Sequence, residues 1–184
     1  MLLFTLPGTP IFHAGDEIGM PNAEIPPDRV RDPFELMVPG YGLNRDPERA
    51  PMRWDAGKNS GFTTGKPWLP LADQIEDRNV ATQLDDERSV VWLYHRLIRL
   101  RQQEPALLAG RFEPQRSQSE VLLYERRLDR PGLCIALNIG DRDEIVQLCG
   151  DFAVLLSSYL DRADGLVHAN LRLRPAEGVI LRRP

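Results

Sequence analysis

The feature that most constrains this chain is the segment 21–80, which shows no sustained hydrophobic period. It holds most of the 16 prolines. Proline fixes φ and removes a backbone donor, so long helices and central strands are excluded there. A structureless segment of this length is uncommon in a compact domain and is usually functional or a lid. Its aromatic residues Trp54, Phe62 and Trp68 are costly to leave in water, so we expect tertiary contacts to hold the segment.

A regular helix follows the irregular segment. Residues 84–110 begin with an N-cap candidate at Asp85 or Asp86. Apolar side chains then recur at helical spacing, which predicts one inward face made of Val90, Leu93, Leu97 and Leu100. Pro105 ends this helix, and one further helical turn closes at Gly110.

After Gly110 the hydrophobic period changes from helical spacing to two. Short runs alternate with Pro-Gly, Gly-Asp, Asp-Gly and Glu-Gly turns, and they read SEVLLYERRLD, PGLCIALNIGD, DEIVQLCGD, FAVLLSSYLD, GLVHANLRLRP and GVILRRP. Strands spaced in this way are typical of an antiparallel β-sandwich. The sequence therefore predicts a domain boundary near residue 110.

Composition excludes several classes of protein. The net charge is −4, and the 23 basic and 27 acidic side chains are interspersed, which argues against a nucleic-acid partner. No run approaches the ~18 consecutive apolar residues of a membrane span. Residues 1–12 are apolar but lack the basic region and cleavage site of a signal peptide. Cys134 and Cys149 are expected to be free thiols in a reducing compartment, so we expect a cytoplasmic protein.

The residues that could carry chemistry are few. His95 and His168 have no second ligand at metal spacing, and no nucleophile, phosphate-loop or dinucleotide motif occurs. His13 lies before Asp16 and Glu17, at the end of what is expected to be an apolar strand. Adjacent carboxylates on a strand point to opposite faces and cannot act together on one bond. Asp16 and Glu17 are therefore interpreted as structural acceptors for loop amides or for a buried arginine.

Five motifs occur in order and resemble one known family. They read LPGTPIFHAGDEIGM, RDPFE, NRDPERAPMRWD, NSGF and PWLP, and the later ALNIGD is also similar to that family's C-terminal β domain. The chain resembles the C-terminal third of an α-glucosidase of the α-amylase superfamily, glycoside hydrolase family thirteen. The resemblance implies an α/β plus all-β fold. Residues 1–109 would be the last strand, long loop and last helix of a (β/α)8 barrel, and residues 110–184 an antiparallel β-sandwich.

The resemblance also implies a role in binding sugar without a role in catalysis. The family's three catalytic carboxylates lie on earlier barrel strands, so no position here matches them and the isolated chain is expected to be inactive. Arg45 matches the arginine that closes the −1 subsite in enzymes that cleave a terminal glucose. The family's partner aspartate is absent, so Arg45 is expected to be solvated, unless it forms a loop salt bridge with Asp46 or Asp32. Glu24 is placed on the loop that would border the plus subsites.

The reaction implied for the parent enzyme is retaining hydrolysis of terminal α-glucosidic bonds in oligosaccharides, with no metal or organic cofactor. Alternatives are a non-catalytic glycan- or protein-binding module and a fragment of a transglucosylase such as trehalose synthase. Departures from the family pattern at His13, Asn44, Ala50 and Arg53 leave the exact substrate open. A lone barrel strand would expose unpaired edges, so self-association through the PIFHAG edge is also expected.

Overall fold

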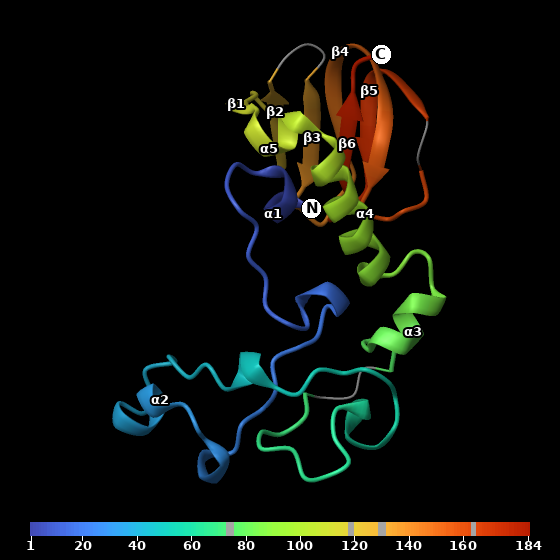
Figure 1. The fold of residues 1–184 in the computed structure, drawn as a ribbon. Helices are drawn as coiled ribbons and strands as arrows, with labels where there is room; N and C mark the ends of the chain where they lie inside the picture. Colours follow the sequence, from blue (N-terminus) through green and yellow to red (C-terminus); the bar gives the residue numbers. More distant parts are fainter. Residues whose placement is uncertain (73–75, 118–119, 129–131, 163–164) are drawn as a thin grey trace. The chain divides into compact units, whose positions relative to one another are not determined.

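A computed structural model describes residues 1–72, 76–117, 120–128, 132–162 and 165–184 (Figure 1). Contacts within the chain group Met1–Ile11 with Leu93–Pro184 in one unit and leave Phe12–Trp92 as a second unit. The first unit contains the sheet and the second contains the irregular segment. The domain assignment of 1–109 and 110–184 stays a prediction.

The described strands form one antiparallel sheet in the order β1-β2-β3-β6-β4-β5. Their bounds are Arg111–Pro114 (β1), Val121–Arg127 (β2), Leu133–Asn138 (β3), Glu144–Ser157 (β4), Leu166–Leu173 (β5) and Gly178–Arg182 (β6). The runs DEIVQLCGD and FAVLLSSYLD, predicted as two strands, are the single strand β4. Gly150 has φ +102°, and the pairing register shifts between Gln147 and Asp151, so β4 continues through the expected turn.

Both faces of the sheet are buried in apolar clusters. One cluster takes side chains from β2 to β6: Val121, Leu123, Cys134, Ala136, Val146, Leu148, Phe152, Val154, Leu171, Leu173, Val179 and Leu181. The opposite face packs against the helices α1 (Leu2–Thr5), α4 (Val90–Gln103) and α5 (Pro105–Ala109) (Figure 1). Strand β3 is buried along its whole length because it contributes alternate residues to both clusters.

The predicted helix is correct for Leu93, Leu97 and Leu100 of its inward face, while Val90 is not part of the cluster and the predicted start is wrong. Leu97 is buried, and Leu93 and Leu100 pack against the cluster that joins the helices to the sheet. Asp85 and Asp86 do not cap this helix, because α3 (Val80–Asp85) ends there before α4 begins. The N-cap of α3 is Asn79, whose side-chain oxygen accepts a hydrogen bond from the backbone N–H of Thr82 at 2.9 Å.

The first residues of the chain are held by a buried arginine on α4. Arg101 donates from Nη1 to the carbonyl oxygens of Phe4 at 2.6 Å and Leu6 at 3.2 Å, and from Nη2 to that of Gly8 at 2.5 Å. These carbonyls lie in α1 and directly after it, where intrahelical donors run out. Arg101 thus supplies the donors that these carbonyls lack at the end of α1.

A second buried arginine comes from the sheet. Arg126, with none of its surface exposed, donates to the carbonyl oxygens of Thr5 at 2.5 Å and Gly110 at 2.9 Å. Burial lowers the pKa of Arg126, and the nearby charge of Arg101 lowers it further. The hydroxyl of Thr5 also hydrogen-bonds the hydroxyl of Tyr124 on β2. Together these contacts fix α1 on the sheet.

The strand expected at PIFHAG is not formed. Residues 9–13 are neither helix nor strand, and Asp16 and Glu17 lie in a 3₁₀ turn, Asp16–Ile18, instead of following a strand. A strand is stable only when a neighbouring strand takes up its backbone hydrogen bonds. The described part of the Phe12–Trp92 unit contains no strand that could do so.

The Phe12–Trp92 unit is held mainly by polar contacts. Its short elements are the helices α2 (Pro33–Met37) and α3 and the 3₁₀ turns Asp16–Ile18, Pro27–Arg29, Pro47–Arg49 and Lys58–Gly61. Its apolar cluster is small and consists of Ala23, Ala50 and Ala72 with Met20 and Ile25. The buried side chain of Gln83 ties the carbonyls of Ile18 and Asp77 together. The expectation that the aromatic residues are buried is wrong, since Trp54, Phe62 and Trp68 are each roughly half exposed.

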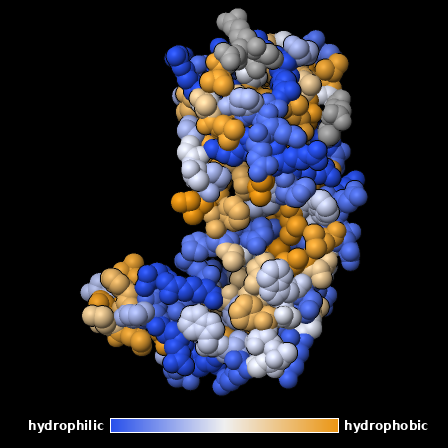
Figure 2. All heavy atoms as spheres, viewed as in Figure 1, coloured by the Kyte–Doolittle hydropathy of each residue, from blue (hydrophilic) through white to orange (hydrophobic). Residues whose placement is uncertain are grey.

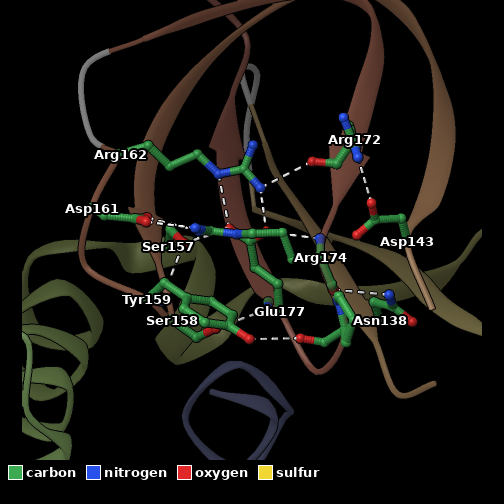
Figure 3. A network of polar contacts seen from close by, with 12 residues as sticks. Asn138, Asp143, Ser157, Ser158, Tyr159, Asp161, Arg162, Arg172, Arg174 and Glu177 are labelled. Atoms are coloured by element: carbon green, nitrogen blue, oxygen red, sulfur yellow. Dashed lines mark hydrogen bonds and ion pairs between the residues drawn. The ribbon is translucent and has the colours of Figure 1, made fainter. Parts of the chain in front are cut away.

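The end of the sheet where β4 finishes and β6 begins contains a polar network centred on Glu177 (Figure 3). The fully buried Glu177 accepts hydrogen bonds from Ser157 at 2.7 Å, from Arg162 Nε at 2.8 Å and from Arg174 Nε at 3.0 Å. Asp161 accepts two further hydrogen bonds from Arg174, at 2.5 and 2.8 Å. Burial raises the pKa of Glu177, but its hydrogen bonds with the arginines outweigh this effect and hold the pKa at about 2. The network joins the end of β4 to the turn between β5 and β6.

We expect Arg101→Ala to lower the free energy of unfolding by about 2–4 kcal/mol, because three carbonyls lose a charged donor in a buried place. Urea denaturation followed by circular dichroism measures this change. Arg99→Ala, at an exposed site on the same helix, is the matched control and should change stability by less than about 0.5 kcal/mol. Equal stability of the two variants would contradict the role given to Arg101.

A pH dependence follows from Glu177. Its pKa of about 2 in the folded state lies below the unfolded value of about 4.3, so its contribution is complete above about pH 5 and is lost as the pH falls towards 2. We expect Glu177→Gln to remove about 2–3 kcal/mol at neutral pH and to make the acid-side loss of stability shallower. Asp141→Asn, at a highly exposed position, should leave the profile unchanged. An unaltered slope in the Glu177→Gln variant would refute this assignment.

Candidate functional site

The strongest candidate site is built on an ion pair between Arg45 and Asp32. Asp32 is fully buried and accepts from Arg45 Nε at 2.8 Å and from Nη2 at 2.7 Å, while the Arg45 side chain is 54% exposed. The hydrogen bonds from Arg45 hold the pKa of Asp32 far below its usual range, against the opposing effect of burial. The expectation that Arg45 is solvated without a partner is therefore wrong. The alternative, a loop salt bridge with Asp32, is the contact found.

Two aspartates hold the two halves of this site together. Asp32 is the N-cap of α2, where it accepts from the backbone N–H of Phe34 at 3.1 Å, and it also accepts from the N–H of Arg45 at 2.8 Å. In return, buried Asp46 accepts from the backbone N–H groups of Arg31 at 2.5 Å and Asp32 at 2.8 Å. Each aspartate thus bonds the backbone beside the other, which fixes residues 31–34 against residues 45–46.

The side chain of Asn44 adds one more hydrogen bond to this arrangement. Its side-chain oxygen accepts from the N–H of Asp46 at 3.0 Å, a turn that asparagine forms readily. The second oxygen of Asp46, Oδ1, is buried and has no hydrogen-bond partner among the described residues. The backbone around Arg45 is therefore fixed by side chains of the same loop.

An open pocket of about 380 Å³ lies beside the ion pair. Its lining residues are Phe34, Gly42, Leu43, Asn44, Arg45 and Glu48. The wall is partly apolar, since Phe34 is 49% exposed and Leu43 is half exposed. Figure 2 shows apolar residues gathered around α2, where Leu36, Met37 and Tyr41 are also exposed. The pocket thus combines one arginine, one carboxylate and an apolar wall.

Glu24, the other predicted binding residue, lies apart from this pair. It is exposed and sits between Ala23 and Ile25, which pack in the small apolar cluster. No hydrogen bond or ion pair joins Glu24 to Arg45 or Asp32 among the described residues.

The region of His13 has a structural explanation. Asp16 accepts from the backbone N–H of His13 at 2.9 Å, and Glu17 accepts from the N–H of Gly15 at 2.8 Å. The interpretation of these carboxylates as acceptors for loop amides is confirmed. A second pocket of about 290 Å³ lies beside them and shares Glu48 with the Arg45 pocket.

The remaining polar candidates are isolated from one another. His168 pairs with Asp151 at 2.7 Å, where both side chains are exposed, and Cys134 and Cys149 are free thiols, as expected. Within the described ranges, no group of three or more His, Cys, Asp and Glu residues is arranged to hold a metal ion. Nor does any helix in the described part of the chain have the length and apolarity needed to cross a membrane.

Comparison with known proteins now identifies the class of this chain. Residues 1–110 match the family described as alpha amylase, catalytic domain. The chain therefore belongs to the α-amylase family, and its relatives are glycoside hydrolases and related enzymes. The resemblance drawn from the five motifs is confirmed, and so is the fold class of a barrel portion followed by an antiparallel β domain.

Three relatives show the range of the family around this chain. Oligo-1,6-glucosidase of Parageobacillus thermoglucosidasius is 32% identical over 95% of this chain and 35% of that protein. Trehalose-6-phosphate hydrolase of Escherichia coli (strain K12) is 32% identical over 97% of this chain and 36% of that protein. The crystal structure of the trehalulose synthase MutB from Pseudomonas mesoacidophila MX-45 has a TM-score of 0.83, with 28% identity over 98% of this chain and 36% of that one. The chain thus spans about a third of the length of the relatives it matches.

The role of Asp46 can be tested by hydrogen exchange. We expect Asp46→Ala to speed exchange at the amides of Arg31 and Asp32 by about tenfold, since each loses a hydrogen bond of about 1–1.5 kcal/mol. Asp28→Ala, at an exposed position of the same loop, should leave both amides protected. Unchanged protection in the Asp46→Ala variant would contradict the clamp between the two segments.

Proposed function

We propose that this chain forms one wall of the sugar pocket of a retaining α-glucosidase that hydrolyses terminal α-glucosidic bonds of oligosaccharides. Arg45 is the residue proposed to contact the sugar, and the observation that carries this proposal is its geometry. Asp32 fixes the guanidinium at Nε and Nη2 while more than half of the side chain stays exposed beside a pocket. A cation fixed in this way can bind a ligand without a further cost in side-chain entropy.

The hydrogen-bonding capacity of Arg45 matches a sugar. A guanidinium has five N–H groups, and Asp32 engages one on Nε and one on Nη2, which leaves both N–H groups of Nη1 and one of Nη2. Hydroxyl groups on neighbouring carbons of a pyranose are acceptors spaced for such a fork. Blocking one end of the pocket with this arginine would restrict cleavage to the terminal glucose.

The catalytic groups are proposed to lie outside this chain. Retaining hydrolysis needs two carboxyl groups about 5–5.5 Å apart on either side of the scissile bond. Asp32, Asp46, Asp16 and Glu17 all accept hydrogen bonds from backbone amides of their own loops, which supports a structural use for each. No metal or organic cofactor is proposed.

Glu24 is proposed to face the outer part of the same substrate, because it is exposed on the loop that precedes α2. The cytoplasmic location and the self-association of the chain stay predictions. Self-association no longer follows from a strand at PIFHAG, since that segment has no strand structure.

Transfer of the glucosyl group, instead of hydrolysis, is the second candidate function. The observation that favours it is the likeness to structures of a trehalulose synthase, with TM-scores up to 0.84 at 27–28% identity. Structures of mutants of that enzyme are known in complex with the substrate sucrose and with isomaltulose. Hydrolysis and transfer share the glucosyl-binding step, in which Arg45 is proposed to act.

The proposal predicts sugar binding without cleavage by the 184-residue chain. We expect isomaltose to shift the NMR resonances of the Arg45 side chain, and no p-nitrophenol to be released from p-nitrophenyl α-glucoside. Arg45→Ala should weaken isomaltose binding by about tenfold or more, as expected for the loss of a charged hydrogen-bond donor. The matched control is Arg49→Ala, another exposed arginine of the same loop that does not line the pocket.

Two results would contradict the proposal in different ways. Equal isomaltose affinity in the Arg45→Ala and unaltered chains would remove Arg45 from the sugar site. Release of p-nitrophenol by the chain alone would show that the catalytic carboxylates are on these residues after all.

A further inference from the structure

An open pocket of about 450 Å³ lies beside the Glu177 network at the end of the sheet (Figure 3). Among the residues that the structure describes, its lining consists of Asp161, Arg162, Arg172 and Arg174. Three of these four side chains are arginines, although the whole chain has a net charge of −4. All four belong to the unit that contains the sheet, so the pocket is built from other residues than the proposed sugar site.

Two of the arginines are fixed by one buried carboxylate. Glu177 accepts from Nε of Arg162 at 2.8 Å and from Nε of Arg174 at 3.0 Å. Nη2 of Arg162 also donates to the carbonyl oxygen of Arg172 at 3.0 Å. The guanidinium of Arg174 packs over the ring of Tyr159, 4.1 Å from its centroid. Both side chains are therefore ordered before any ligand arrives, which reduces the entropy lost on binding.

The network leaves N–H groups of two arginines available. A guanidinium has five N–H groups. Arg162 engages its partners through Nε and Nη2, so both N–H groups of Nη1 have no partner among the described residues. Arg172 donates once, from Nη2 to Asp143 at 2.5 Å, and its Nε and Nη1 groups have no partner in the described part of the chain. The pocket thus has unused donors from two strongly basic side chains.

The charge of Arg172 is the least compensated of the three. The side chains of Arg172 and Asp143 are 74% and 43% exposed, and such ion pairs contribute little to stability because water screens them. The other two arginines are held by the more buried carboxylates of Asp161 and Glu177. An anion that enters the pocket can therefore replace Asp143 as the partner of Arg172 without breaking the buried network.

A phosphate group matches these donors better than a carboxylate does. A phosphate monoester carries a charge of about −1.5 to −2 and three terminal acceptor oxygens, whereas a carboxylate has one charge and two oxygens. Arginine binds phosphate oxygens with two parallel N–H groups. The pocket volume lies within the range of about 300–1,000 Å³ found for small-molecule sites, which leaves room for the organic part of a small ester.

We propose that Arg162, Arg172 and Arg174 form a binding site for the phosphate group of a small phosphate monoester. Arg162 and Arg172 contact the phosphate oxygens, and Arg174 supplies a fixed positive charge beside them. Glu177 is the positioning residue, because it holds the guanidiniums of Arg162 and Arg174. The site goes beyond the proposed function, since it binds an anion with residues of the other unit.

The test compares glycerol 3-phosphate with glycerate, a carboxylate of similar size, and with inorganic phosphate. Each is titrated into the 184-residue chain at constant ionic strength while the arginine side-chain resonances are followed by NMR. We expect glycerol 3-phosphate to shift the resonances of Arg162 and Arg172 along a saturable curve. Glycerate should bind at least about fivefold more weakly, because it carries roughly half the charge. Inorganic phosphate should bind no more tightly than the ester, because the pocket also accommodates the organic part.

Two variants test the assignment to a particular residue. Arg172→Gln removes the least compensated charge and leaves the hydrogen bonds of Glu177 in place, so we expect a native circular dichroism spectrum. Its affinity for glycerol 3-phosphate should fall by about tenfold or more, as for the loss of a charged hydrogen-bond donor. Arg142→Gln is the matched control, because Arg142 is 88% exposed and does not line the pocket. It should keep its affinity within about twofold, since salt screens distant exposed charges.

Several results would overturn the inference. One is the absence of a saturable shift up to about 10 mM glycerol 3-phosphate. Equal affinities for glycerate and glycerol 3-phosphate would remove phosphate as the recognised group, and tighter binding of inorganic phosphate would exclude an ester. Equal losses in the Arg172→Gln and Arg142→Gln variants would show a general attraction to surface charge. None of these results bears on Arg45, whose test uses an uncharged sugar and a different resonance.

Discussion

Backbone polar groups outside helices and strands must find partners, and in this chain buried charged side chains supply them. Asp32 and Asp46 accept from the amides of one loop, while Arg101 and Arg126 donate to the carbonyls of the first residues. All four side chains are buried, and each bonds backbone groups that lie in a loop or at the end of a helix. Leaving these backbone groups unpaired would cost about 1–3 kcal/mol each, so the irregular parts depend on these side chains more than on apolar packing.

The candidate site follows from this use of charge. Because Asp32 must be buried to cap α2 and to bond the backbone of Arg45, its carboxylate needs a cation, and the Arg45 side chain provides it. The side chain of Arg45 is then fixed, and only two of its five N–H donors are used. A structural requirement of the loop thus produces a fixed, exposed set of N–H groups. This is the property that a sugar-binding pocket needs.

The sequence predicted the periodic parts of this fold well. Strands were predicted from the alternation of apolar residues in 121–127, 133–138 and 166–173, and the buried face of α4 was predicted from helical spacing. Both patterns are informative because the packing of one face of an element determines where its apolar residues lie. The strand expected at PIFHAG failed because an apolar run forms a strand only beside a neighbour. The two strands expected around Gly150 failed because a glycine with positive φ can bend a strand as well as end it.

The site was predictable only in part. The motif around Arg45 was recognised and Asp32 was named as one of two possible salt-bridge partners, but spacing and charge pattern did not choose between Asp32 and Asp46. One local signal existed, since Asp32 followed by Pro33 is a common start of a helix and would have indicated α2. The network around Glu177 had no signal of its own, because its members come from separate turns that are joined only by the pairing of β4, β5 and β6.

The residues that depart from the family pattern differ in where their side chains lie. Ala50 and Arg53 are buried inside the Phe12–Trp92 unit, where they affect packing, while Asn44 lines the Arg45 pocket. Asn44 stands where related α-glucosidases usually have glycine, and its side chain spans the turn to Asp46, which keeps the clamp intact. It also adds an amide to the pocket wall beside Arg45. If the Arg45 pocket binds sugar as proposed, Asn44 is the departure placed to contact the ligand, whereas Ala50 and Arg53 lie in the core.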